Sequence, residues 1–138
     1  MEHSDKQHLL AQTLEDIDAR INLLEDDIRR DNVEKDFSQL LERASRIAGE
    51  LMIAYARHAD KLIPDTDDLL KVFRAFVKGD PSLNAVRDNV RELVYYRNCL
   101  EMGKSEALPV RPAHMAVRTV RHMYLYLYTR CSQEQRLP

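Results

Sequence analysis

The amino-acid sequence predicts an all-α protein, a single up-and-down bundle of about five helices with a long N-terminal helical hairpin. Three observations support this fold class. Apolar residues recur at alternating intervals of four and three along most of the chain, which is the spacing of one face of a helix. The 138 residues contain only 3 Gly and 5 Pro, so most of the chain must lie in long elements. A composition with 44% apolar and 32% charged residues is typical of one globular domain, which we place at residues 1–138.

The first two predicted helices each carry a strict heptad seam. Asp31 followed by Glu34 has the spacing of a capping box, which predicts the start of the second helix. That helix is expected to end near His58 or Ala59. The seams consist of Leu10, Leu14, Ile17, Ile21, Leu24 and Ile28, then Val33, Phe37, Leu40, Ala44, Ile47 and Leu51. Two such neighbours predict a helical hairpin.

Turn and capping residues delimit two further helices. Asp65 or Thr66 is expected to cap a short third helix, which Gly79 then stops because glycine adopts the left-handed conformation of a helix end. The Asp-Pro pair at 80–81 predicts an N-cap and a first-turn proline for the fourth helix. This helix should end near Gly103, before the longest loop.

The fifth helix is predicted over residues 113–131. Its apolar face comprises Ala113, Ala116, Val117, Val120, Tyr124, Leu127 and Tyr128. Because the end of this helix is apolar nearly all round, it is either the central helix of the bundle or part of a subunit contact. Together with the two seams, this excess of apolar faces predicts a homodimer.

The totals exclude several classes of protein. A net charge of −2 does not fit a broadly basic nucleic-acid binder. No run of about 18 uncharged apolar residues is present, so no membrane span is expected. The N-terminus lacks the signature of a signal peptide, and Cys99 and Cys131 are expected to be free thiols, which favours a cytoplasmic protein. No motif for a metal or cofactor occurs, and none is expected.

The positive charge is concentrated at the C-terminal end. After residue 107, five arginines are accompanied by one acidic residue, Glu134. The arginines are Arg111, Arg118, Arg121, Arg130 and Arg136. This end either binds an anion or offsets the acidic first helix within the bundle.

Arg97 is the first residue singled out as a candidate site. The stripe of the fourth helix, followed by threes and fours through Leu93 and Leu100, places Arg97 on the apolar face. A guanidinium there needs a partner because burying an unpaired charge is costly. Arg97 either forms an internal ion pair, or extends its charged end to solvent as a snorkelling side chain, or binds a phosphate.

A second candidate is a basic stripe on the fifth helix. His114, Arg118, Arg121 and His122 follow one another at helical spacings, with Arg111 nearby. The stripe is either a solvated face or a surface that binds a phosphate backbone, with neighbouring tyrosines stacking on bases.

The order and lengths of the helices over about residues 35–130, with Tyr95-Tyr96-Arg97-Asn98 in the fourth, resemble HEPN domains. These are small helical bundles, usually dimeric, of toxin–antitoxin and nucleotidyltransferase-associated systems. In catalytic members an arginine, followed by a polar residue, is separated by four to six residues from a histidine, and the pair cleaves RNA without metal. The resemblance implies that Arg97 holds a phosphate and Asn98 assists, but the histidine position falls at 102–104, where no histidine stands.

The leading hypothesis is therefore a non-catalytic, HEPN-like binding or partner module that recognises RNA or a nucleotide phosphate. Its candidate partners are a second copy and a nucleotidyltransferase or another protein. Two alternatives remain open. One is a metal-independent ribonuclease that combines Arg97 with a non-standard histidine, His114 or His122. The other is a structural or adaptor bundle without a small ligand.

Overall fold

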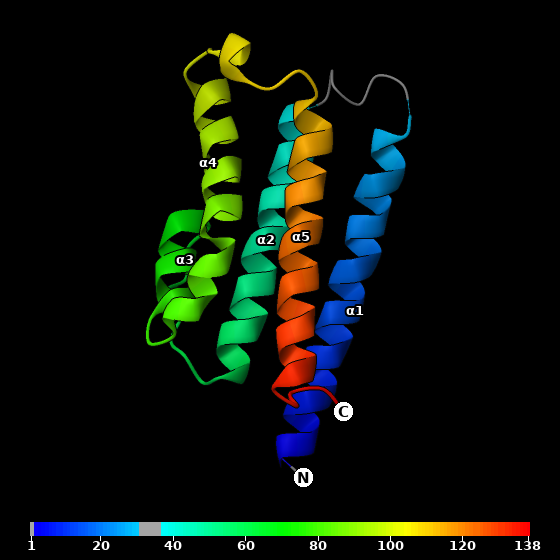
Figure 1. Ribbon diagram of the computed structural model, residues 1–138, viewed down its shortest axis with the longest axis vertical. Coiled ribbons are helices and arrows are strands. Elements are labelled where there is room, and N and C mark those ends of the chain that lie inside the picture. Colours follow the sequence, from blue (N-terminus) through cyan, green and yellow to red (C-terminus); the bar gives the residue numbers. More distant parts are fainter. Residues whose placement is uncertain (1, 31–36) are drawn as a thin grey trace.

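The computed structural model describes residues 2–30 and 37–138, which contain five α-helices and no strand (Figure 1). The helices are α1 (Glu2–Ile28), α2 (Phe37–His58), α3 (Leu69–Val77), α4 (Arg87–Glu101) and α5 (Pro112–Gln133). Two short 3₁₀ helices, η2 (Pro81–Val86) and η3 (Ser105–Ala107), precede α4 and α5. The predicted fold class is confirmed.

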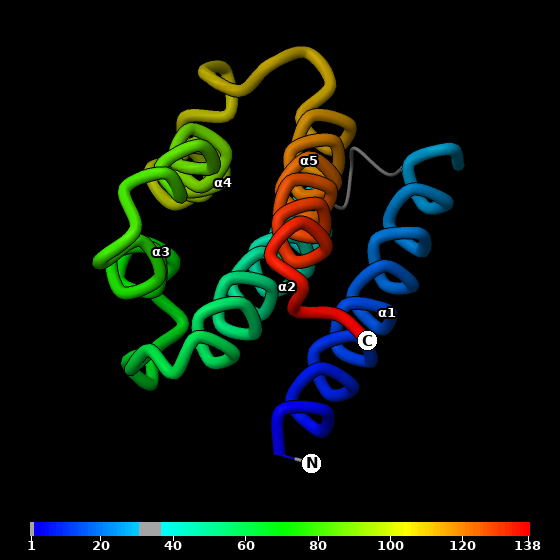
Figure 2. Tube along the Cα trace, turned by 60° about the horizontal axis from the view of Figure 1, so that its bottom comes forward, coloured from blue at the N-terminus to red at the C-terminus, as the bar shows by residue number. Residues whose placement is uncertain are grey.

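The helices are arranged in three groups. α1 and α2 pack against each other as an N-terminal hairpin, as expected. α5 packs against α1, α2 and α4, while α3 packs on α2 and α4. In Figure 2, α2 and α5 therefore lie in the middle, with α1 on one side and α3 with α4 on the other. Of the two predicted positions for α5, the central one is observed.

The two heptad seams are buried inside this one chain. Leu10, Leu14, Ile17, Ile21 and Leu24 of α1 belong to the same core cluster as the seam of α2 from Phe37 onwards. Burial of large aliphatic side chains stabilises by about 1.5–3 kcal/mol each, so the hairpin is a main contributor to stability. The predicted capping box at Asp31 and Glu34, and Val33 of the second seam, lie outside the described residues.

Two predicted helix starts differ from the structure. α3 is capped by Asp68, whose carboxylate accepts hydrogen bonds from the backbone N–H groups of Leu70 and Lys71, at 3.0 and 3.3 Å. Thr66 instead accepts a hydrogen bond from the N–H of Asp68, so the predicted cap at Asp65 or Thr66 was wrong by two or three residues. Pro81 does begin a helix, but the first turns are 3₁₀ and α4 starts at Arg87.

Glycines end α3 and α4 as predicted. Gly79 and Gly103 have φ values of +84° and +66°, a left-handed conformation that L side chains rarely adopt. On α5 the predicted apolar face is buried except for Tyr128, which is 44% exposed. Cys99 and Cys131 are buried free thiols.

Arg97 does not lie on the apolar face, contrary to the sequence prediction. The buried residues of α4 are Val90, Leu93, Tyr96 and Cys99. The stripe runs through Tyr96 instead, whose ring packs edge-on against Phe37 of α2 at 6.0 Å between ring centres, so the next residue, Arg97, is turned away from α2. Figure 1 shows that α4 extends beyond the shorter α3. The Arg97 side chain is 58% exposed and pairs with Glu101, one turn away, at 3.0 Å.

Candidate functional site: the outer face of helix α5

Two side-chain contacts fix the rotation of α5 about its own axis. On the α4 side, the Thr119 hydroxyl donates a hydrogen bond of 2.7 Å to Glu92, which also accepts one from the Tyr96 hydroxyl. On the α1 side, Arg121 is held by carboxylates of α1. At about 100° per residue, Arg118 and His122 lie on the side of α5 between Thr119 and Arg121 that is turned away from the core, so both face outward.

Arg121 is a cross-link between α5 and α1. It donates to both oxygens of Glu25, at 3.1 and 2.8 Å, to Asp18 at 2.6 Å, and to Asn22 at 2.8 Å. The hydrogen bonds to Glu25, followed by those to Asp18, hold the pKa of the guanidinium above its usual range. Its side chain is only 17% exposed. Arg121 therefore offsets the acidic first helix, one of the two roles that the sequence left open.

Arg130 and Arg136, at the other end of α5, also form ion pairs within the fold. Arg130 pairs with Asp80 at 3.1 Å and with Glu134 at 2.6 Å, and Arg136 pairs with Glu134 at 2.8 Å. The Tyr55 hydroxyl also donates to Glu134, and the Arg136 guanidinium lies 3.9 Å from the centre of the Tyr55 ring. These contacts tie the C-terminal residues to α2.

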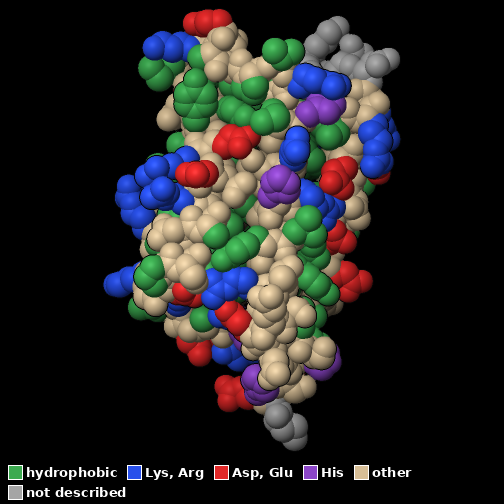
Figure 3. Space-filling model, in the orientation of Figure 1, with side chains coloured by type: hydrophobic (Ala, Val, Ile, Leu, Met, Phe, Trp, Pro, Cys, Tyr) green, Lys and Arg blue, Asp and Glu red, His purple; other side chains and the backbone are tan. Residues whose placement is uncertain are grey.

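Arg118 and His122 are exposed and have no ion-pair or hydrogen-bond partner within the part of the chain that the structure describes. One and two turns closer to the start of α5, Arg111 donates to the ring of His114 at 3.1 Å. We call Arg111, His114, Arg118 and His122 the α5 basic face. Figure 3 shows blue and purple side chains following one another over the upper half of α5, with acidic side chains beside them towards α1.

The structure does not join Arg97 to this face. Arg97 lies five residues after Glu92, which points to α5, so it is turned by about 140° from the α5-facing side of α4. Asn98 is exposed beside it. Of the six candidate residues, three therefore share the α5 basic face, namely His114, Arg118 and His122, while Arg121 is internal and Arg97 and Asn98 lie elsewhere.

The structure contains a groove between α1 and α2 that the sequence did not predict. It has a volume of about 370 Å³ and is lined by the outer flank of α1 and the last turns of α2. The available signals were Leu9, an apolar residue outside the seam of α1, and His58 at the end of α2. Neither indicates a groove until the packing angle of the two helices is known.

Within residues 2–30 and 37–138, no three His, Cys, Asp or Glu side chains gather as metal ligands would. In the same part of the chain, no helix has the length and apolar character needed to cross a membrane. Comparisons with protein-family models, with curated proteins and with solved structures give no match.

Proposed function

We propose that the protein is a non-catalytic helical module that binds RNA through the phosphate backbone, with the α5 basic face as the contact surface. The observation that carries the proposal is the state of Arg118 and His122. In a bundle where other arginines of α5 are fastened to carboxylates, these two side chains are exposed and have no partner among the described residues.

The arrangement of the face suits an extended anion. Arg111, Arg118 and His122 follow the helix axis over about 17 Å, calculated from a rise of 1.5 Å per residue. A row of cations along one line matches a backbone that carries repeated charges better than a single small anion. The start of α5 adds the positive end of a helix dipole beside Arg111 and His114.

Aromatic side chains continue the same helix beyond the cations. Tyr126 is partly exposed, with its hydroxyl donating to the backbone of Ser82, and Tyr128 is exposed. Exposed aromatic rings next to a basic groove or stripe stack on unpaired bases in proteins that bind single strands. This favours single-stranded RNA as the ligand.

We further propose that the module is HEPN-like, in keeping with the five helices and with Arg97-Asn98 on α4. The proposal includes a homodimer and an association with a nucleotidyltransferase or another protein. The large exposed apolar side chains available for a dimer contact on α5 are Met115, Leu125 and Tyr128, because the heptad seams are internal. Light scattering at micromolar concentration should give twice the chain mass, and Leu125→Glu should halve it.

Binding can be tested by fluorescence anisotropy with a labelled single-stranded RNA at several salt concentrations. Arg118→Ala should weaken binding and lower the salt slope by about 0.7 for the one lost phosphate contact. Arg91→Ala is the matched control, since Arg91 is an exposed arginine of α4 outside the face. Equal effects of the two variants, or no RNA binding at low salt, would contradict the proposed function.

A further inference from the structure

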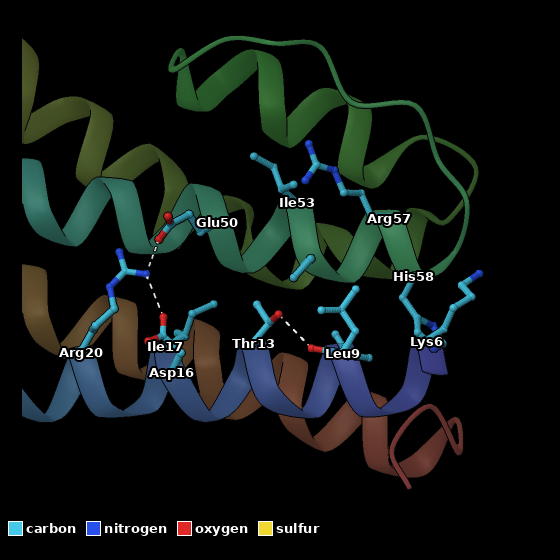
Figure 4. Close-up of a pocket in the computed structure, with 12 residues that line it drawn as sticks. Lys6, Leu9, Thr13, Asp16, Ile17, Arg20, Glu50, Ile53, Arg57 and His58 are labelled. Atoms are coloured by element: carbon cyan, nitrogen blue, oxygen red, sulfur yellow. Dashed lines mark hydrogen bonds and ion pairs between the residues drawn. The ribbon is translucent and has the colours of Figure 1, made fainter. Parts of the chain in front are cut away.

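The groove between α1 and α2 combines an apolar floor with charged ends (Figure 4). Its apolar part is formed by Leu9, Leu10, Ile17, Ile53 and Ala54, and the Thr13 hydroxyl between them donates to the backbone carbonyl of Leu9 at 2.9 Å. At one end Arg20 pairs with both Asp16 and Glu50, so two carboxylates share one guanidinium and that end of the groove is net negative. At the other end lie Lys6 and His58, with Arg57 on the rim.

The groove lies on the opposite flank of α1 from α5. Asp18, Asn22 and Glu25 face Arg121, whereas Thr13 and Asp16 line the groove. By the helical period these two sets point about 170° apart. A ligand in the groove would therefore not touch the α5 basic face, and the inference does not depend on RNA binding.

The end marked by His58 is polar but incompletely satisfied. The Nε2 atom of His58 is shielded from water and has no hydrogen-bond partner among the described residues. Buried ring nitrogens normally have one, so this atom marks a position that a ligand group can complete. Burial, followed by the charges of Arg136 and Lys6, lowers the pKa of His58. Lys6 pairs with Asp60 at 3.1 Å, and the Asp60 side chain is 84% exposed, so this contact is open to exchange with a ligand carboxylate.

The size and shape of the groove fit a short hydrocarbon chain. Its volume lies near the lower end of the range of about 300–1,000 Å³ typical of small-molecule sites. The apolar stretch from Leu9 to Ile17 is about 12 Å long at 1.5 Å per residue. Leu9, at the mouth, is 66% exposed, which leaves apolar surface for a ligand to cover.

We propose that the α1–α2 groove binds a free single-chain amphiphile of the medium-length fatty-acid type, with its carboxylate at the His58 end. Lys6 exchanges Asp60 for the carboxylate, and the His58 ring turns so that its Nε2–H, shielded in the unliganded protein, donates a hydrogen bond to the same carboxylate. The chain lies along Thr13, Ile17 and Ala54, and the Arg20 ion pairs close the far end. The cations near His58 and the net negative charge of Asp16 and Glu50 around Arg20 set the direction of the ligand.

The proposal is tested by isothermal titration calorimetry of the full chain with sodium decanoate, decanol and decyltrimethylammonium. One decanoate should bind per chain, more tightly than decanol, and the cation should not bind. His58→Phe keeps a ring of similar shape without the nitrogen and should weaken decanoate binding about tenfold, the effect of losing one hydrogen bond to a charged group. Lys71→Ala, an exposed lysine of α3, is the control for Lys6→Ala and should change nothing.

Two further variants separate loss of the site from loss of the fold. Leu9→Glu places a carboxylate at the mouth and should abolish binding, whereas Leu23→Glu, at another exposed leucine of α1, should not. Ala54→Phe should fill the groove, with the exposed Ala19→Phe as its control. Circular dichroism checks folding in each case.

Several outcomes would overturn the proposal. They are no binding up to millimolar decanoate, equal binding of decanol, and equal loss in Leu9→Glu and Leu23→Glu. Tighter association with phosphatidylglycerol vesicles than with monomeric decanoate would assign the groove to a membrane surface instead. A twofold chain mass that Leu9→Glu halves, without decanoate binding, would assign it to a second copy.

Discussion

Arg118 and Arg121 stand three residues apart on α5 and have opposite environments. Arg121 turns towards α1 and is held by Asp18, Asn22 and Glu25. Arg118 turns outward and has no partner among the described residues. Two arginines in the same helix turn therefore have different environments. Arg121 joins α5 to α1, whereas Arg118 is exposed to solvent.

The largest expected effect is on the free energy of unfolding, and it comes from removing Arg121, the paired arginine. Arg121→Ala leaves Asp18 and Glu25 without their cation and should lower the free energy of unfolding by about 2 kcal/mol, within the range for hydrogen bonds to charged groups. Arg118→Ala should change it by less than about 0.5 kcal/mol. Urea denaturation of both variants measures the difference. Equal losses would show that Arg118 also has a structural partner.

A second prediction concerns the loss of stability at low pH, and it involves Arg130, another arginine that is paired within the fold. Hydrogen bonds from Ser82, at 2.5 Å, and the charge of Arg130 hold the pKa of the Asp80 carboxyl below its usual value of 3.8. Because the folded pKa lies below the unfolded one, this stabilisation is present above pH 3.8 and is lost as the pH falls through the folded value.

The wild-type protein should therefore lose stability below pH 3.8, and Asp80→Asn should lose less over the same interval. Thermal unfolding followed at pH 5, 4 and 3 by circular dichroism, at about constant ionic strength, measures this. Arg118→Ala serves as the control and should keep the wild-type acid profile. A profile for Asp80→Asn as steep as that of the wild type would contradict this role of Asp80.

The sequence predicted the helices well because their signals are local. The heptad seams of α1 and α2, and the stops at Gly79 and Gly103, depend on residues within a few positions of one another. The cap of α3 was misplaced because Asp65, Thr66, Asp67 and Asp68 are all good N-cap residues. The structure places the cap at Asp68, directly before Leu69, which is buried in the core.

The candidate site was harder to predict because its signals are not local. Whether an arginine on α5 is paired depends on which side faces α1, and neither Arg118 nor Arg121 carries that information in its neighbours. Arg97 was misplaced for a similar reason. The buried stripe of α4 shifts to Tyr96 and Cys99, and the contact of Tyr96 with Phe37 of α2 is not visible in the period of α4.

A third prediction follows for Arg97, with a smaller effect. Its pairing with Glu101 is an exposed contact within one helix, which typically stabilises by about 0.3–0.5 kcal/mol. Arg97→Ala should therefore change the free energy of unfolding by less than about 0.5 kcal/mol, far less than Arg121→Ala. Urea denaturation decides it. A loss of several kcal/mol would indicate that Arg97 lies on the inner face of α4 after all.

The last prediction is the smallest effect, namely that the purified protein does not cleave RNA. Transfer at a 2′-hydroxyl needs a group that titrates near neutrality within hydrogen-bond reach of the phosphate. Near Arg97 the corresponding positions hold Met102, Gly103 and Lys104, and the imidazoles of α5 lie on a different side. If the α5 basic face binds phosphates as proposed, salt-sensitive binding without turnover is expected. Incubation with labelled RNA in EDTA tests this. Metal-independent cleavage lost in both Arg97→Ala and His114→Ala or His122→Ala would show that the two faces meet, most simply across two copies of the chain.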